Sequence, residues 1–523
     1  MTGARGHAEI EVKLALDPAL ADALPAHPAV GALRRGPTRV ARLRTIYHDT
    51  ADRRLAREGI ALRSRRTGRR WTIAVKGAPG AAGTLASRPE IEWPSATAAP
   101  DPLRLSATPW RVVFARALAR GSLAPVFETD VERTTIPVAF DDGTTATIDI
   151  DRGWIVASAG SPPRARAAVC EVEIELGRGD PSRLLDLAGL FADELGCALE
   201  PRSKAERGYA LADGRTPVPV KAREVDLAAG AGARAAAVAM LSECIRQIEG
   251  NAVGFPAPAD PEWIHQIRIG VRRLRSLLAL SGDLFAQERV DHLKHETRWL
   301  LDALGPARDL DVYALQTLPL ALDDPSFAPA DRAGAPWDRR AYSRRVAVRR
   351  RATHSDADAA IGSPRFVRFV LSAIAMTIAA DDDRRRPEDG DTSARAYARR
   401  RLERRARRLD EAGARLVHAT DDQRHTVRIA AKKLRYATEF YAPLFPRRRA
   451  RAFRERLERL QDVLGEFNDA AVAPRVTASI AGPASPVTAA IDAWSRARCA
   501  RLADPIDAAW RRYASGRPFW DRD

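Results

Sequence analysis

Charged and apolar residues alternate in several short segments of the N-terminal part of the chain. The first begins at Glu9 and reads Glu-Ile-Glu-Val-Lys-Leu. Because successive side chains of a strand point to opposite faces, its charges share one face and its apolar residues the other. The alternation recurs at Arg63 and Arg65, Glu90 and Glu92, Asp149 and Asp151, and Glu171, Glu173 and Glu175. The pattern predicts a closed or strongly curved sheet with a charged interior.

The region up to about residue 212 is expected to combine strands with a few helices. The strand candidates are 8–16, 42–49, 60–66, 70–76, 88–93, 126–138, 145–151, 154–158 and 169–176. Helices are expected over 103–120 and 181–195, the second after a plausible start at Asp180-Pro181. Residues 213–232 are rich in Gly, Pro and Ala and are expected to be a linker.

From about residue 233 the pattern changes to long helices with an internal repeat. HQIRIGVRRLRS begins at His265, and HTVRIAAKKLRY begins 160 residues later at His425. The segments around Gly305 and Gly465 keep the same spacing. Two matched pairs predict a duplicated, pseudo-symmetric helical bundle. Residues 319–364 are expected to be an insertion or mobile loop, and residues 381–393 a solvated connection.

Composition indicates a globular chain with an anionic partner. The 523 residues include 85 Lys and Arg against 68 Asp and Glu, a net charge of +17. Nucleic acid, an acidic membrane surface and inorganic polyphosphate all fit that charge. The four cysteines form no CxxC pair, which disfavours a thiolate zinc site and favours a reducing, cytoplasmic setting. No apolar run of about 18 residues is present, so no membrane span is expected.

The predicted charged interior suits a metal-bound polyphosphate. Unpaired buried charge is costly, so such an interior must hold water and a charged ligand. Carboxylates bind hard cations such as Mg²⁺, and Arg and Lys neutralise phosphate oxygens. Any single pair could instead be an ordinary surface salt bridge, whereas the whole set favours a binding site. Its basic members are Lys13, Arg63, Arg65, Lys76, Arg133 and Lys204.

The segments together resemble the CYTH (triphosphate tunnel metalloenzyme) superfamily over about residues 7–212. The matching motifs are Glu9-x-Glu11-x-Lys13, Tyr47-His48-Asp49-Thr50, Leu62-Arg63-Ser64-Arg65, Thr72 to Gly77, Arg88-x-Glu90-x-Glu92, Arg133-Thr134, Asp151-x-Gly153, Glu171-x-Glu173-x-Glu175 and Ser203-Lys204-x-Glu206-Arg207-Gly208. The resemblance implies an antiparallel eight-stranded tunnel in an α+β chain. It also implies Mg²⁺ or Mn²⁺ held by Glu9, Glu11, Asp151, Glu171 and Glu173, with Glu175 ranked lower.

By the same resemblance, the catalytic set is Glu9, Glu11, Lys13, Arg63, Arg65, Lys76, Arg133 and Lys204. The six basic residues of this set would hold the triphosphate. Members of the superfamily include inorganic, thiamine and RNA triphosphatases and adenylyl cyclases. The resemblance therefore implies triphosphate binding and leaves the reaction open.

The repeated helices each carry a basic stripe. His265, Arg268, Arg272 and Arg275 fall on one helical face, about 15 Å long. The second copy repeats it with His425, Arg428, Lys432 and Arg435, and Arg273 and Lys433 flank the two stripes. One copy could be a solvated helix face, but the duplication favours a long anion bound along both. Neither histidine has a neighbouring nucleophile or metal-ligand spacing.

These helices resemble the CHAD (conserved histidine α-helical) domain over about residues 233–517, including Leu304-Gly305-x-x-Arg308-Asp309 and Leu464-Gly465-x-x-Asn468-Asp469. The resemblance implies an all-α domain that binds polyphosphate through His265, Arg268, Arg272, Arg273, Arg275, His425, Arg428, Lys432, Lys433 and Arg435. Some domains of this kind associate with polyphosphate granules, which adds granules to the expected cytoplasmic location. Asn468 stands where the first copy has Arg308, so we expect unequal halves. The arginine run over 399–408 is expected to be a solvated helix.

We therefore expect a metal-dependent inorganic triphosphatase in domain 1–212, a linker over 213–232, and a polyphosphate-binding domain over 233–517. One alternative is a non-catalytic polyphosphate-binding or granule-associated protein. Another is a triphosphatase acting on an organic triphosphate such as thiamine triphosphate, or an ATP cyclase. Nucleic-acid binding is disfavoured because only Tyr436 adjoins either repeat motif, and base stacking needs aromatic platforms.

Overall fold

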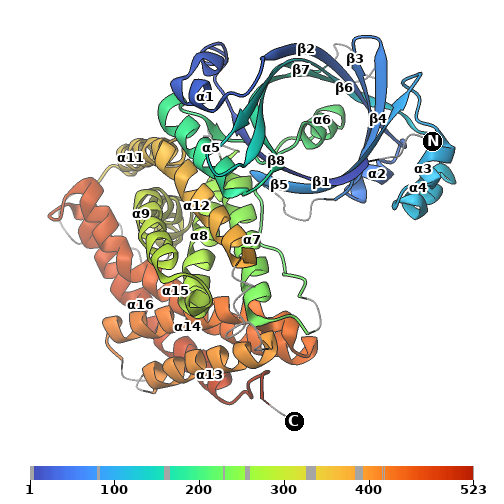
Figure 1. The fold of residues 1–523 in the computed structure, drawn as a ribbon. Coiled ribbons are helices and arrows are strands. Elements are labelled where there is room, and N and C mark those ends of the chain that lie inside the picture. The colour runs from blue at the N-terminus through green and yellow to red at the C-terminus, as the bar shows by residue number, and fades with distance from the viewer. Residues whose placement is uncertain are drawn as a thin grey trace. The chain divides into compact units, whose positions relative to one another are not determined.

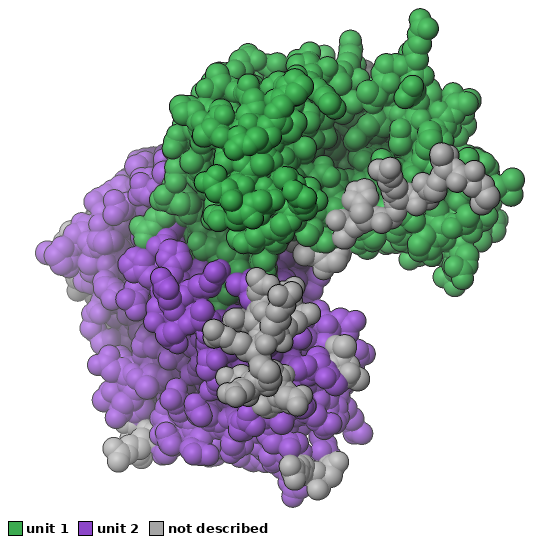
Figure 2. Space-filling model, in the orientation of Figure 1, with its two compact units in different colours: residues 1–220, 249–254, 362–378 green, residues 221–248, 255–361, 379–523 purple. Residues whose placement is uncertain are grey.

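The computed structural model describes residues 5–78, 83–157, 165–227, 230–253, 260–324, 337–382, 393–414, 416 and 419–521 (Figure 1). The chain divides into two compact units, which Figure 2 shows in different colours. The first contains residues 1–220, 249–254 and 362–378. The second contains residues 221–248, 255–361 and 379–523.

The first unit is built on a closed antiparallel barrel. Its strands are β1 (Arg5–Ala15), β2 (Arg39–Asp49), β3 (Ala61–Thr67), β4 (Arg70–Lys76), β5 (Leu85–Ser95), β6 (Ala124–Ala139), β7 (Thr145–Ala157) and β8 (Arg166–Arg178). They follow the order β5-β4-β3-β2-β6-β7-β8-β1, and pairing of β1 with β5 closes the ring. The short strand β9 (Ala198–Leu199) also pairs with β1. The predicted eight-stranded antiparallel tunnel is confirmed among the described residues.

Part of the outer face of the barrel is apolar and is covered by helices. Helices α2 (Arg54–Arg57), α3 (Pro102–Ser106) and α4 (Arg111–Leu118) contribute to a core with β3, β4 and β5, in which Ile73 and Val75 are fully buried. Helix α5 (Ser182–Leu195) packs against β1 and β8, and the short α1 (Pro28–Leu33) against β6. Along β1, β3, β4, β5 and β8 the alternation seen in the sequence thus places apolar residues outward and charged ones inward, whereas exposed ion pairs such as Arg42–Asp130 join β2 and β6.

Two predicted elements of this unit differ from the structure. The helix expected over 103–120 is two helices, α3 and α4, separated by a break that contains Pro109, a residue that disrupts helix interiors. The segments expected over 145–151 and 154–158 belong, as far as Ala157, to one strand, β7, which runs through Gly153; residue 158 lies outside the described residues. A Cβ atom at Gly153 would lie 2.1 Å from the carbonyl oxygen of Asp130 on β6. Only glycine therefore lets the strand continue at that close approach.

Helix α6 (Lys204–Ala212) lies inside the ring of strands (Figure 1). Its Ala205 and Tyr209 pack in an apolar core with inward-facing residues such as Tyr47 and Phe127. At Gly208, a Cβ atom would stand 2.0 Å from the Phe127 ring, so the helix approaches the barrel wall too closely for any larger residue. This apolar core occupies one part of the barrel interior, and the charged side chains line the remaining part.

The region after the barrel is helical. Its helices are α7 (Ala233–Ala252), α8 (Glu262–Ser281), α9 (Gln287–Val312), α10 (Leu318–Leu322), α11 (Arg339–Ile361), α12 (Pro364–Asp382), α13 (Ala394–Gly413), α14 (Asp421–Tyr441), α15 (Arg447–Ala481) and α16 (Pro486–Ala514). The repeat motif that begins at His265 lies on α8, and the one that begins at His425 lies on α14. The two glycine motifs lie in α9 and α15. The pseudo-symmetric relation between the copies stays a prediction.

The expected loop over 319–364 is wrong in its described part. Residues 318–322 form α10 and residues 339–361 form α11, while 325–336 lie outside the described residues. Helix α11 was missed because it contains many arginines and buries only a narrow stripe, with Tyr342 and Val346 among its buried residues.

The expected connection over 381–393 lies mostly outside the described residues, which stop at 382 and resume at 393. The linker boundaries stay predictions. The arginine run over 399–408 lies on α13, as expected. Among the described residues, no single helix is long and apolar enough to cross a membrane. The bent pair 339–361 and 364–379 reaches that length and composition only when both helices are counted together.

Candidate functional site

The part of the barrel interior not filled by α6 is a cavity with about 890 Å³ of empty space, its mouth included. Its wall carries both signs of charge, from at least five strands and from the start of α6. The lining residues with charged side chains are Glu9, Glu11, Lys13, Arg63, Arg65, Lys76, Arg88, Glu90, Glu92, Arg133, Glu173, Glu175 and Lys204. The structure thus brings most of the predicted tunnel residues into one hollow.

Lys204 is held at the first turn of α6 by a capping box. The Ser203 hydroxyl accepts a hydrogen bond from the Glu206 amide, and the Glu206 carboxylate accepts one from the Ser203 amide. From there the Lys204 ammonium reaches Asp151 at 2.6 Å and Glu173 at 3.0 Å, and also pairs with Glu171. Burial opposes the charged form, but these carboxylates raise the pKa of Lys204. Lys204 is therefore a fixed cation in the cavity wall.

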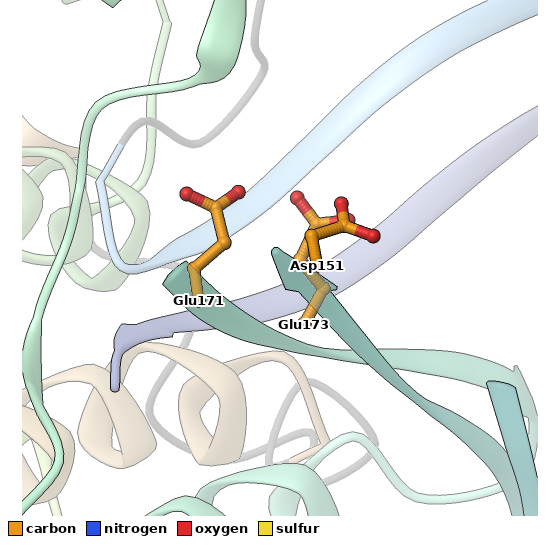
Figure 3. A group of neighbouring side chains, drawn as sticks. All are labelled: Asp151, Glu171 and Glu173. Atoms are coloured by element: carbon orange, nitrogen blue, oxygen red, sulfur yellow. The ribbon is translucent and has the colours of Figure 1, made fainter. Parts of the chain in front are cut away.

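Asp151, Glu171 and Glu173 form a buried acidic cluster on β7 and β8 (Figure 3). Each offers one oxygen, and these oxygens lie within 4.8 Å of one another. Oxygen ligands at this spacing are consistent with a divalent metal site. The Lys204 ammonium and Arg133, which donates to Asp151 and Glu173, already neutralise much of this cluster. Asp151 and Glu171 are both 0% exposed, and neither is among the residues that line the cavity.

A second acidic group faces the cavity at Glu9, Glu11 and Glu175. Lys76 pairs with Glu9, and Lys13 lies 3.4 Å from Glu11. Glu175 has no ion-pair partner among the residues that the structure describes. Burial, followed by repulsion from Glu9, raises the pKa of Glu175 to about 7. A carboxylate crowded by like charges in this way is a good ligand for an added cation.

Spacing places Glu171, Glu173 and Glu175 on one face and does not distinguish them. The sequence analysis ranks Glu175 last of the three. The structure separates them by their partners. Glu171 pairs with Lys204 and Arg207, and Glu173 pairs with Arg133 and Lys204, whereas Glu175 stands beside acidic neighbours. No signal within one strand could reveal this difference, since it depends on which strands lie alongside.

On the cationic side of the cavity, Arg65 lies close to other positive charges. Arg63 donates to Glu90 at 2.8 Å, while the described contact of Arg65 is to the Thr45 hydroxyl at 3.4 Å. Burial, with repulsion from Arg63 and Arg133, lowers the pKa of Arg65 to about 10. No carboxylate pairs with Arg65 within the described part of the chain. A buried guanidinium in this state favours an anionic ligand.

The two basic stripes of the helical region converge, as the repeat predicts. Arg272 on α8 lies close enough to Arg428 and Lys432 on α14 to act on both electrostatically. Burial, followed by repulsion from Arg428 and Arg272, lowers the pKa of Lys432 to about 7. Arg308 lies near the same group, because burial and then repulsion from Arg308 lower the pKa of His265 to about 4. Equivalent positions of both copies thus form one basic cluster.

Not every predicted basic residue lies on that cluster. Arg273 is 2% exposed, donates to Gln247 at 2.9 Å and lies over the Phe440 ring, so it belongs to the helical core. Arg268 is 5% exposed and donates to the Leu301 carbonyl at 2.7 Å. Arg275, His425 and Lys433 are exposed, and Arg435 pairs with Glu439 at 3.1 Å. Burial makes Arg273 unsuitable as a contact for a bound anion.

Comparison with protein families matches both regions. The CYTH domain family model matches residues 7–209, and the CHAD domain family model matches residues 239–478. The chain is a CYTH domain fused to a CHAD domain. The charged cavity lies in the CYTH domain, and the basic cluster of α8 and α14 lies in the CHAD domain.

Three relatives give the degree of similarity. An inorganic triphosphatase of Haemophilus influenzae is 30% identical over 208 residues, which are 39% of this chain and 54% of that protein. The chain thus spans about half the length of that relative. The CHAD domain structure from the plant Ricinus communis is 29% identical, with a TM-score of 0.47 over 56% of this chain and 96% of the other. PptA from Streptomyces chartreusis is 19% identical, with a TM-score of 0.41 over 54% of this chain and 100% of the other.

Proposed function

We propose that the CYTH domain hydrolyses inorganic triphosphate to phosphate and pyrophosphate with Mg²⁺ or Mn²⁺. The observation that carries this proposal is the cavity itself, in which unpaired or crowded cations and a crowded carboxylate group face one hollow. A triphosphate with its cation would relieve both kinds of crowding. The similarity to an inorganic triphosphatase over the tunnel region supports the same substrate.

The divalent cation would be held chiefly by Glu9, Glu11 and Glu175. This differs from the set implied by family resemblance, which also included Asp151, Glu171 and Glu173. Those three surround the Lys204 ammonium, so a cation among them would have to displace Lys204. Glu173 still lines the cavity and could contribute an oxygen. When bound, the cation would polarise the phosphoryl group and neutralise its charge.

The chain's own residues bind and orient the triphosphate. Arg65, with no described carboxylate partner, offers a planar guanidinium to two phosphate oxygens. Arg63, Lys13 and Lys76 extend the cationic wall, and a preset wall favours the charge that spreads over the phosphoryl oxygens in the transition state. Arg133 and Lys204 keep the acidic cluster neutralised and contribute further positive charge. The α6 core excludes water from the other part of the barrel interior.

The CHAD domain is proposed to bind inorganic polyphosphate through the converged stripes. The proposed contacts are His265, Arg272, Arg275, His425, Arg428, Lys432, Lys433 and Arg435. Arg268 and Arg273 are left out because both are buried and donate hydrogen bonds inside the domain. The support is the cluster of like charges around Lys432, because cations held this close are stabilised by a polyanion. By this proposal the protein is cytoplasmic and associates with polyphosphate granules.

A substrate panel tests the enzymatic proposal. Purified full-length protein with Mg²⁺ or Mn²⁺ is offered inorganic triphosphate, longer polyphosphate, ATP and thiamine triphosphate, and phosphate release is measured. We expect inorganic triphosphate to give the highest kcat/KM. Higher turnover of thiamine triphosphate or ATP would show that the substrate is that organic triphosphate. The absence of turnover with either metal would instead favour a non-catalytic polyphosphate-binding protein.

A further inference from the structure

The CHAD domain has a groove, and none of the residues that line it is among those assigned to polyphosphate. It has about 1190 Å³ of empty space, its mouth included, between α11 on one side and the π-helical turn 313–317 with α10 on the other. One wall carries Leu315 and Leu318, and the α11 wall carries Val346, Arg350, Arg351 and His354. We propose that this groove binds an acidic amphipathic helix of a partner protein.

Three exposed apolar residues lie on the elements that form the groove, and one of them, Leu315, lines it. The described residues include nine exposed large hydrophobic side chains, and three of them belong to this region: Leu315, Leu320 and Val348. Leu315 is 51% exposed although it lines the groove. Clustered exposed apolar side chains beside a polar rim mark interaction sites, whereas isolated ones need no explanation.

The groove depends on a local departure from the α-helix. Residues 313–317 form a π-helical turn between α9 and α10, and Ala314 and Leu315 of this turn line the groove. Such turns are rare and are often found at functional sites. In the second copy the equivalent segment continues as regular α-helix within α15, with Arg475 where the first has Leu315. The groove is therefore specific to the first copy.

The basic wall of the groove is held in place by a buried carboxylate. Asp311 is 0% exposed and accepts hydrogen bonds from Arg350 at 2.6 Å and from His354 at 2.9 Å. Asp311 thereby fixes two polar side chains of α11 before any ligand binds. Preorganisation of this kind reduces the entropy lost on binding.

Charge and length point to an acidic helix. The exposed Arg344 and Arg351 have no ion-pair partner within the described ranges, and Asp358 is the acidic residue at the far end of the lining. The α11 wall runs from Ser343 to Asp358, about 22 Å at 1.5 Å per residue. A helix of about 15 residues would cover this length with leucines on the floor and glutamates beside the arginines.

Other occupants fit the groove less well. A concave, helix-length groove does not match the flat surface of a bilayer. The described lining contains no aromatic side chain on which nucleic-acid bases could stack. An elongated polyphosphate would gain nothing from the apolar wall.

The test uses a fluorescent synthetic peptide of 18 residues, with leucines at helical spacing and glutamates on the flanks, titrated into the full chain. We expect saturable binding that weakens at least tenfold in Leu315→Glu and in Arg351→Glu, both changes at exposed positions. The matched controls are Val112→Glu, at a 51% exposed position of α4, and Arg407→Glu on the exposed face of α13. Both controls should bind like the wild type.

Four outcomes would overturn the proposal: no saturable binding, equal binding of a scrambled peptide, equal loss in the controls, or no loss in the two groove variants. A parallel titration uses vesicles of neutral lipid with and without phosphatidylserine. Vesicle binding that depends on Leu315 and Arg351 while the peptide fails would assign the groove to a membrane surface instead. Circular dichroism confirms that each variant is folded. Peptide binding should persist in Glu11→Gln, since it does not depend on the proposed hydrolysis.

Discussion

Glu11 of β1 and Glu175 of β8 are direct partners in the antiparallel register, and both line the barrel cavity. Like charges opposite each other on one face destabilise a sheet. The pair therefore destabilises the protein without metal, and a cation bound between the two carboxylates would remove this repulsion. This relationship is the basis for placing the metal beside Glu175.

The first prediction concerns stability against pH. Burial and Glu9 raise the pKa of Glu175 to about 7, against 4.5 for an unperturbed glutamate. The folded state therefore binds more protons than the unfolded state between these values, and stability falls as pH rises from about 4.5 to about 7. The loss is at most about 3 kcal/mol for this group. Denaturant unfolding at pH 5 and pH 8 in the presence of a chelator measures it.

Glu175→Gln is the matched variant for that experiment. It should lose most of this pH dependence and should be more stable than the wild type at pH 8 without metal. Added Mn²⁺ should stabilise the wild type more than the variant. An identical response to Mn²⁺ in both proteins would remove Glu175 from the proposed metal site, and loss of that response in Glu171→Gln would return the metal to the buried cluster.

A second prediction concerns helix α6. Gly208→Ala places a methyl group against the Phe127 ring, which a Cβ atom would approach to 2.0 Å. We expect a loss of about 1–3 kcal/mol in stability from overpacking. Triphosphate turnover should also fall, because the same helix positions Lys204. Gly31→Ala on α1 is the control, since nothing lies within 4 Å of its Cβ position. Equal activity of the two variants would contradict this role of α6.

The adjacent residues Arg272 and Arg273 should respond differently to replacement. Arg272→Ala should weaken polyphosphate binding about tenfold and leave unfolding unchanged, since a charged hydrogen bond contributes about 1.5–3 kcal/mol. Arg273→Ala should instead lower stability by about 1–3 kcal/mol, because it removes the guanidinium that donates to the Oε1 atom of the buried Gln247. Polyphosphate titration and thermal unfolding of both variants distinguish the two roles. The reverse result would show that Arg273, and not Arg272, binds polyphosphate.

Polyphosphate binding should depend on pH near neutrality. Burial and its basic neighbours lower the pKa of Lys432 to about 7, and a bound polyanion would raise it again. Binding then takes up a proton, and affinity falls about tenfold as pH rises from 6 to 8. Lys432→Arg should bind with little pH dependence over that range, since arginine stays protonated. Calorimetry in buffers of different ionisation enthalpy counts the protons, and a pH-independent wild type would contradict the prediction.

The fold could be predicted from sequence where a single pattern, such as the alternation of charged and apolar residues, determines it. Alternation places Lys13 and Arg63 on inner faces, and the resemblance to the CYTH superfamily implies the antiparallel eight-stranded barrel. The single strand through Gly153 could not be foreseen, because the need for glycine comes from the carbonyl of Asp130 on another strand. Helix α11 was missed because its stripe of buried residues is narrow and its arginines resemble a solvated segment.

The candidate site was predictable in its membership and less so in its partnerships. Spacing places Glu171, Glu173 and Glu175 on one face, but the positions of Lys204 and Arg133 decide which of them is already neutralised. Likewise, helical spacing does not show that Arg273 donates to the buried Gln247 on α7 while Arg272 acts on the basic group at Lys432. Contacts between elements distant in sequence determine such differences.

The central claim is that the charged cavity turns over a triphosphate with its cation. The most direct test is the initial rate of phosphate release from inorganic triphosphate with Mg²⁺ or Mn²⁺ for the wild type, Glu11→Gln and Glu132→Gln. Glu132 lies on β6 with an exposed side chain and serves as the control. The account predicts metal-dependent release by the wild type and the control and almost none by Glu11→Gln. Equal rates in all three proteins, or none in the wild type, would contradict it.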